Sequence, residues 1–210
     1  MKVLLVNGSP HPRGCTYTAL SQVAETLNGQ GIDTEIFHIG ARPISGCIAC
    51  GKCSETGRCI IDDKVNEFLA LAESADGFVF GTPVYYASAN GAMMSFLDRA
   101  FYSDVRGGKN RFYLKPGCAV ISARRSGTTA TFDIINKYFT ISHMPIVSSQ
   151  YWNMVHGNSP EEVLQDLEGL QIMRTLGRNM AWLLKSIEAG KKSGVALPER
   201  EKKISTNFIR

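Results

Sequence analysis

Long hydrophobic runs are absent from this sequence of 210 residues. A helix needs roughly 18 or more consecutive apolar residues to cross a bilayer, so we expect no membrane span. The sequence also has no large excess of charge of one sign. The 23 Lys and Arg against 19 Asp and Glu leave a net charge of +4, too small to indicate a nucleic-acid partner. The first residues carry no signal-peptide pattern, and we therefore expect a cytoplasmic protein.

Two common nucleotide-binding motifs are also missing from the N-terminal stretch. A P-loop needs a lysine that this loop lacks, and the dinucleotide fingerprint needs three glycines where only Gly8 and Gly14 occur. What is present is an apolar run, Val3 to Val6, then a loop rich in hydroxyl groups, then helical spacing from Thr16. A strand, a short loop and a helix start make an anion site. We therefore interpret the loop as a phosphate cradle; the alternative is a plain strand-to-helix turn.

Strand and helix patterns alternate along the rest of the chain, which predicts a doubly wound parallel sheet with helices on both faces. The last helix has the clearest start, with Ser159 as N-cap, Pro160 at the first position and Glu162 completing a capping box. Gly190 is its expected end. We thus expect one domain over 1–190, with an irregular loop at 40–62, and an extended tail, 191–210, that lies on a neighbouring subunit. The five predicted strands are 3–6, 33–39, 78–80, 118–121 and 145–148.

Three loops should meet at the carboxyl edge of this sheet, because ligands of such folds bind there. The first is 9–18. The second, Thr82 to Asn90, has a rigid Pro83 and two adjacent tyrosines suited to an aromatic ring, although a core tyrosine pair is the alternative. The third, Ser122 to Thr128, carries two arginines that suit a negative charge or a phosphate, or that are simply solvated.

The motifs in these loops resemble those of the flavodoxin-fold NAD(P)H-dependent FMN reductases. The resemblance rests on Val6-Asn-Gly-Ser-Pro10, on Thr82-Pro-Val-Tyr-Tyr86 with the following Phe96-Leu-Asp-Arg99, and on Ser122-Ala-Arg-Arg-Ser-Gly-Thr128. It implies a flavodoxin-like five-stranded sheet of order 2-1-3-4-5. Cys15 departs from the family, which often has Asn there, and a thiol is a weaker donor.

The resemblance also assigns residues to FMN. The phosphate would be held by Ser9, His11, Arg13, Cys15, Thr16, Tyr17 and Thr18. The isoalloxazine and ribityl chain would contact Pro83, Val84, Tyr85 and Tyr86, and the pyrimidine edge would lie beside Ala123, Arg124 and Gly127.

Four of the six cysteines are closely spaced: Cys47, Cys50, Cys53 and Cys59. In a reducing compartment such spacing favours metal or redox chemistry over disulfides. Short spacings let one loop surround a small cubic cluster with one thiolate per iron. The pattern resembles that of the iron–sulfur flavoproteins, which implies a [4Fe-4S] cluster near FMN. Zinc and cluster-free thiols remain alternatives.

The sequence thus leads us to expect an FMN-dependent oxidoreductase. It would take hydride from NAD(P)H and pass electrons to a small molecule or redox protein, through the cluster if one is present. The flavin carries this chemistry, so no catalytic side chain is expected. By resemblance, we expect a homodimer or homotetramer. The alternative function is a non-enzymatic electron carrier or redox sensor without an NAD(P)H site.

Overall fold

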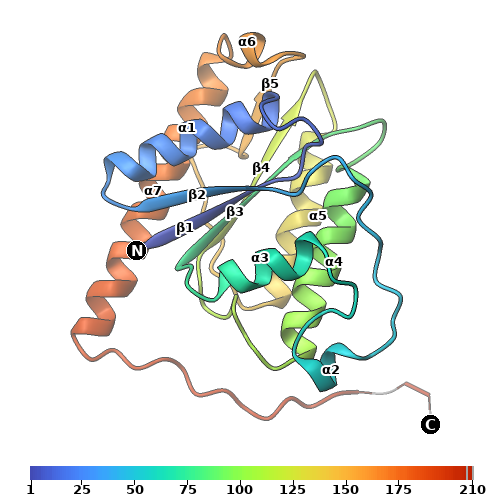
Figure 1. The fold of residues 1–210 in the computed structure, drawn as a ribbon. Coiled ribbons are helices and arrows are strands. Elements are labelled where there is room, and N and C mark those ends of the chain that lie inside the picture. The colour runs from blue at the N-terminus through green and yellow to red at the C-terminus, as the bar shows by residue number, and fades with distance from the viewer. Residues whose placement is uncertain (207, 210) are drawn as a thin grey trace.

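The computed structural model describes residues 1–206 and 208–209. Its centre is a sheet of five strands in the order β2-β1-β3-β4-β5, and every neighbouring pair is parallel (Figure 1). This confirms the predicted flavodoxin-like fold class. The strands are β1 Lys2–Asn7, β2 Asp33–His38, β3 Gly77–Pro83, β4 Gly117–Ala123 and β5 Met154–His156.

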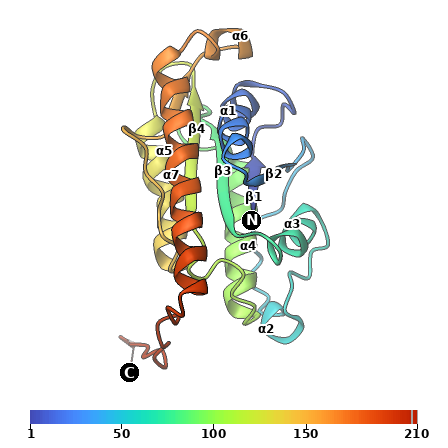
Figure 2. The same cartoon turned by 90° about the vertical axis from the view of Figure 1, so that its left-hand side faces the viewer.

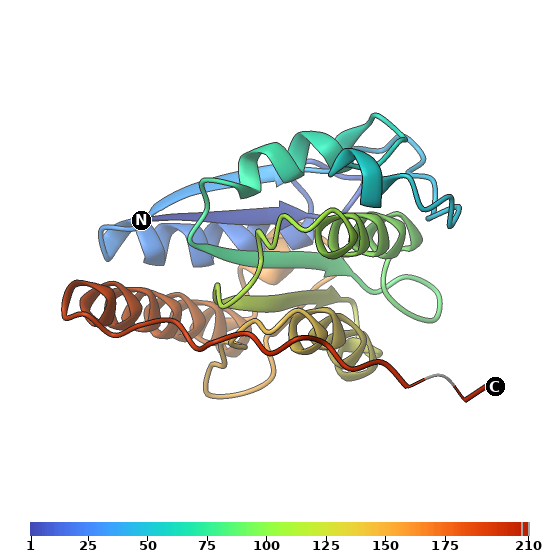
Figure 3. The same cartoon turned by 90° about the horizontal axis from the view of Figure 1, so that it is seen from below.

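Helices cover both faces of this sheet (Figure 3). One face packs against α1 Cys15–Gly29, α6 Pro160–Val163 and α7 Leu167–Lys192, and the other against α3 Lys64–Ala72, α4 Gly91–Arg106 and α5 Thr128–Ile141. A short helix, α2 Cys53–Thr56, lies within the cysteine-rich loop, where the sequence had suggested no element. Within 1–206 and 208–209, no helix is both long and apolar enough to cross a membrane.

The two faces of the sheet have different cores. Leu4 and Val6 project toward α3, α4 and α5, where Phe68 lies within 6.2 Å, centroid to centroid, of five other phenylalanine rings. Val3 and Leu5 project the other way, into an aliphatic core formed with α1 and α7. This alternation follows from the two-residue period of a strand. The continuous apolar run that predicted β1 therefore marks a strand buried on both faces.

The predicted fifth strand, 145–148, is wrong. Only one isolated bridge, between Gly117 and Ile146, joins that segment to the sheet. Val147 is buried, so its apolar character reflects packing against the α1–α7 layer. The fifth strand is Met154–His156, which pairs with the carboxyl end of β4. Three residues are too few to show a periodicity in the sequence.

The predicted single last helix is also wrong. Ser159 does act as an N-cap, accepting a hydrogen bond from the Glu162 N–H, but it caps only the four-residue α6. The chain then turns, and Asp166 caps α7 by accepting from the Gly169 N–H. Gly190 does not end the helix, which continues to Lys192. The capping signal was read correctly and assigned to the wrong helix.

Beyond α7 the tail leaves the end of the helix and runs along the base of the molecule (Figures 1 and 2). The Arg200 guanidinium lies 4.4 Å from the centroid of the Tyr113 ring and donates to the Asn110 side chain. These contacts are with the tail's own chain. The expected contact with a neighbouring subunit stays a prediction.

Candidate functional site

An open cleft of about 650 Å³ lies at the carboxyl edge of the sheet. Segments that follow β1, β3 and β5 form its walls, so two of the three predicted loops meet here. The residues that line it are Ser9, His11, Pro12, Arg13, Gly14, Cys15, Pro83, Tyr85, Asn158, Ser159 and Pro160. None of them is acidic, which suits an anionic ligand.

Asn7, at the end of β1, fixes the shape of the first loop. Its side-chain N–H groups donate to the carbonyls of His11 and Pro12, and its Oδ1 accepts from the Ser9 N–H at 3.1 Å. The Ser9 hydroxyl in turn accepts from the His11 N–H at 3.1 Å. His38, on β2, lies 2.8 Å through Nε2 from the Ser9 carbonyl, so it supports the shape of the loop. The loop is therefore held in place before any ligand binds.

The start of α1 supplies the anion-binding chemistry. Its N-cap is Gly14, and among the described residues no side chain caps this helix. The first N–H groups of a helix have no partner within the helix, and the helix dipole favours negative charge beside them. Arg13 is exposed immediately before this turn, at the rim of the cleft.

The side chains of three predicted phosphate ligands form hydrogen bonds with other groups of the protein. The Thr16 side chain is buried and lies 2.8 Å, Oγ1 to Oγ, from Ser122, which joins α1 to β4. The Thr18 hydroxyl donates to the Gly14 carbonyl at 3.3 Å. The Cys15 thiol lies 3.6 Å from the Gly157 carbonyl, and burial is the main cause that raises the pKa of this thiol, which therefore stays protonated. At these positions the backbone N–H groups are the more available donors.

The loop after β3 forms a small hairpin at the cleft edge. Val84 forms an antiparallel bridge with Ala89, and the Tyr85 N–H donates to the Ser88 carbonyl at 2.8 Å. Tyr85 is half exposed and lines the cleft, whereas Tyr86 is fully exposed. The alternative of a core tyrosine pair is therefore wrong. Of the two tyrosines, only Tyr85 lines the cleft.

The loop after β4 packs against this hairpin. Gly127 has a φ of +90°, and a Cβ there would lie 2.9 Å from Cγ1 of Val84. Ala123 is buried, while Arg124 and Arg125 are both exposed. The third predicted loop thus lies beside the second without lining the cleft itself.

The sequence prediction missed Asn158, Ser159 and Pro160 as part of the site. They lie at the carboxyl edge because β5 ends at His156. Because the sequence prediction placed the fifth strand at 145–148, it assigned these residues to the start of a helix far from the end of that strand. The available signal was a short apolar segment, Met154 and Val155, that a Gly-Asn turn separates from the capping box.

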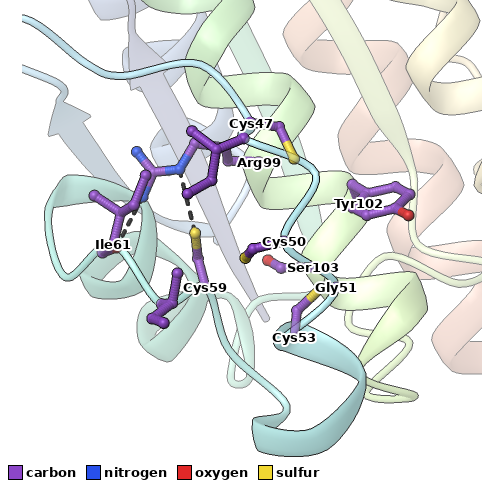
Figure 4. A pocket seen from close by; sticks show the side chains of 11 residues that line it. Cys47, Cys50, Gly51, Cys53, Cys59, Ile61, Arg99, Tyr102 and Ser103 are labelled. Atoms are coloured by element: carbon purple, nitrogen blue, oxygen red, sulfur yellow. Dashed lines mark hydrogen bonds between the residues drawn. The ribbon is translucent and has the colours of Figure 1, made fainter.

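The four clustered cysteines line a second, smaller cavity (Figure 4). Cys47 and Cys50 are exposed, Cys59 is half-buried, and Cys53 is buried at the start of α2. Apolar side chains, Ile48, Ile60, Ile61 and Tyr102, complete the wall together with Arg99 and Ser103 of α4. All four predicted ligands are thus brought to one place.

The side chains that line this cavity include the kind of donor that an iron–sulfur cluster uses. In the described part of the chain, no three His, Cys, Asp or Glu side chains come close enough together to hold one ion. In a cubic cluster each thiolate binds its own iron. Four thiols from one short loop, around one cavity with a mostly apolar wall, supply that number and kind of donor.

Known flavoproteins resemble this chain over most of its length. The model of the NADPH-dependent FMN reductase family matches residues 1–159. An iron–sulfur flavoprotein of Methanocaldococcus jannaschii is 30% identical over 193 residues, which is 90% of this chain and 100% of the relative. Another, from Methanosarcina thermophila, is 23% identical over 189 residues, 90% of this chain and 97% of the relative.

Solved structures share the fold at lower identity. RosB, crystallised with 8-demethyl-8-formylriboflavin-5′-phosphate, has a TM-score of 0.70 at 15% identity, over 100% of this chain and 94% of RosB. A WrbA-like flavodoxin from Agrobacterium tumefaciens has a TM-score of 0.60 at 16% identity, over 88% and 96% of the two chains. With the fold, the cleft and the family match in agreement, the chain belongs to the NADPH-dependent FMN reductase family of flavodoxin-like flavoproteins.

Proposed function

We propose that this protein binds FMN in the carboxyl-edge cleft and oxidises NAD(P)H. The observation that carries the proposal is the start of α1, which no described side chain caps, in a cleft without acidic residues. A helix start of this kind attracts a phosphate group. The FMN reductase family and the flavoprotein relatives support the same ligand.

Different residues of the chain would contact different parts of FMN. The first turn of α1, with Ser9, His11 and Arg13, would bind the phosphate, Arg13 supplying a full positive charge. Pro83, Val84 and Tyr85 would lie along the ring and ribityl chain. The loop after β4, which lies beside the cleft and not in its wall, would meet the pyrimidine edge of the ring: Ala123 and Gly127 would flank that edge, and Arg124 would stabilise negative charge there. When bound, FMN supplies hydride acceptance and single-electron donation.

We further propose that Cys47, Cys50, Cys53 and Cys59 hold a [4Fe-4S] cluster. Helix α4 links the two sites, because it starts right after the β3 hairpin and carries Arg99 at the cysteine cavity. The eight residue steps from Gly91 to Arg99 span about 12 Å along a helix axis. Cys47 and Cys50 are exposed, so a small-molecule or protein acceptor would reach the cluster from that side.

Anaerobic purification followed by an absorption spectrum and iron and sulfide assays tests the cluster. Flavin bands with roughly four irons per chain support it. Flavin bands without iron after anaerobic reconstitution overturn the cluster and leave a simple flavin reductase.

A titration with FMN tests the cleft. We expect Arg13→Ala to weaken FMN binding by about tenfold, the loss of one charge-assisted hydrogen bond. Arg125→Ala is the matched control, since Arg125 is also an exposed loop arginine but was not assigned to FMN. Equal affinities for both variants and the wild type would place the phosphate elsewhere.

Stopped-flow mixing with NADPH and with NADH tests the enzymatic part of the proposal. Rapid bleaching of the flavin by either nucleotide supports the oxidoreductase. Flavin that stays oxidised with both would instead indicate an electron carrier.

A further inference from the structure

Arg99, on α4, carries the largest fully buried side chain among the described residues, with an exposed fraction of 1%. A guanidinium has five N–H donors. Here Nη1 donates to the Asp63 carboxylate at 2.6 Å and to the Ser45 carbonyl at 3.3 Å, and Nη2 donates to the Asp63 carboxylate at 2.9 Å and to the Ile61 carbonyl at 2.8 Å. Nε donates to Sγ of Cys59 at 3.3 Å. Every donor is therefore used.

These acceptors lie at the two ends of the cysteine motif. Ser45 comes two residues before Cys47, while Cys59 and Ile61 come at its far end. Asp63, which also caps α3, accepts two of the five bonds and balances the buried charge. Arg99 thus joins both ends of the cysteine loop to the helix α4 that the fold already holds rigidly.

Packing alone does not explain a buried cation here. Removing a charge from water is costly, and a buried ion pair is often no more stabilising than apolar side chains of the same volume. What an apolar residue lacks is a donor aimed at a cysteine sulfur. Among the four cysteines, Cys59 is the one that Arg99 contacts by a hydrogen bond.

We propose that Arg99 is a positioning residue that holds Cys59 for the iron–sulfur cluster and raises the reduction potential of that cluster. The inference rests on the cluster half of the proposed function. Reduction adds one negative charge to the cluster, and hydrogen bonds to its sulfurs and nearby positive charge stabilise that charge. A fixed N–H donor to the Cys59 sulfur therefore favours the reduced form.

The test compares the wild type with Arg99→Lys and with the control Arg111→Lys. Lysine keeps the charge but cannot reproduce the planar set of five donors. Arg111 is also a largely buried arginine, paired with Asp104 and Glu73, and it contacts no cysteine through a hydrogen bond that the described residues make. The readouts are iron per chain and the midpoint potential, measured by dithionite titration under spectroscopic observation.

In Arg99→Lys we expect either loss of iron with FMN binding retained, or a loaded cluster whose reduced form is disfavoured by about tenfold, which is about 59 mV for a one-electron couple. Arg111→Lys should match the wild type. A fully loaded Arg99→Lys cluster with the wild-type potential overturns the inference while leaving the cluster itself intact. An iron-free wild type overturns the cluster proposal and the inference with it.

If Arg99→Lys does not fold, Asp63→Asn decides the question. Asn still caps α3 but removes the negative charge beside the guanidinium. We expect its cluster potential to rise. An unchanged potential would overturn the inference.

Discussion

Buried polar residues at the carboxyl edge hold the loops of the site to one another. Asn90 donates through its side chain to the Gly8 carbonyl at 2.8 Å, and Thr16 is joined to Ser122. The family resemblance assigned Thr16 to the FMN phosphate. The structure instead buries that hydroxyl, because a buried polar group needs a partner and Ser122 is the one that β4 provides.

At Gly127, a single residue sets the distance between two loops of the proposed site. We expect Gly127→Ala to lower the free energy of unfolding by about 1–2 kcal/mol and to weaken FMN binding, because alanine is strained at φ +90° and its Cβ would press on Val84. Chemical denaturation and an FMN titration measure the two effects. Gly91→Ala is the control, since nothing lies within 4 Å of a Cβ there. Equal stability of the two variants would contradict the prediction.

The buried thiol of Cys118, the second residue of β4, predicts that stability depends on pH. Burial raises the pKa of this thiol above its ordinary value of 9.0. The folded state keeps the proton that the unfolded chain releases, so the stabilising contribution is complete below about pH 9 and is lost as pH rises further.

Between pH 8 and pH 10 the wild type should therefore lose about 1–2 kcal/mol more stability than Cys118→Ala, which has no thiol to titrate. Urea denaturation at both pH values measures the difference. Cys15 and Tyr138, whose pKa values burial also raises, are common to both proteins and cancel. Parallel pH profiles would show that Cys118 does not contribute.

At the scale of elements, the placement of β5 decides which residues reach the cleft. Its three residues pair with the end of β4, and the turn that follows brings Asn158 to Pro160 to the cleft wall. Asp166 then ties β5 to α7, because its carboxylate accepts from the His156 N–H at 2.7 Å and from the Gly169 N–H at 2.9 Å.

The N-caps of α6 and α7 should therefore contribute differently to stability. Asp166→Ala removes the cap of the 26-residue α7 and its bond to β5, and we expect a loss of about 2 kcal/mol. Ser159→Ala removes the cap of the four-residue α6 and should cost about 0.5–1 kcal/mol. Urea denaturation ranks the two variants. The reverse order would mean that α6 and α7 act as one helix, as the sequence first suggested.

At the scale of the whole molecule, the cleft and the tail lie at opposite ends of the sheet. The tail contacts Asn110 and Tyr113, which precede the start of β4, whereas the cleft lies beyond the strand ends. The apolar tail residues Leu197 and Ile204 are exposed, which suits contact with a second copy of the chain.

Deleting the tail from Lys191 onward should therefore leave FMN binding unchanged and reduce the mass of the assembly measured by light scattering. We expect the untruncated chain to form a homodimer or homotetramer. An unchanged mass after truncation would remove the tail from the interface. Weaker FMN binding would show instead that assembly builds the cleft.

The sequence by itself determined four of the five strands and two of the loops that line the cleft, and its family resemblance implied the strand order. A buried strand, a loop rich in Gly and Ser, and an apolar stripe at helical spacing are local patterns, and they located β1 and α1. The cysteine spacing likewise placed four thiols in one loop. Tertiary structure decided what local patterns do not contain: a three-residue β5 that exists only beside β4, the burial of the Thr16 hydroxyl, and the contact of Arg99 with Cys59, forty residues away in the chain.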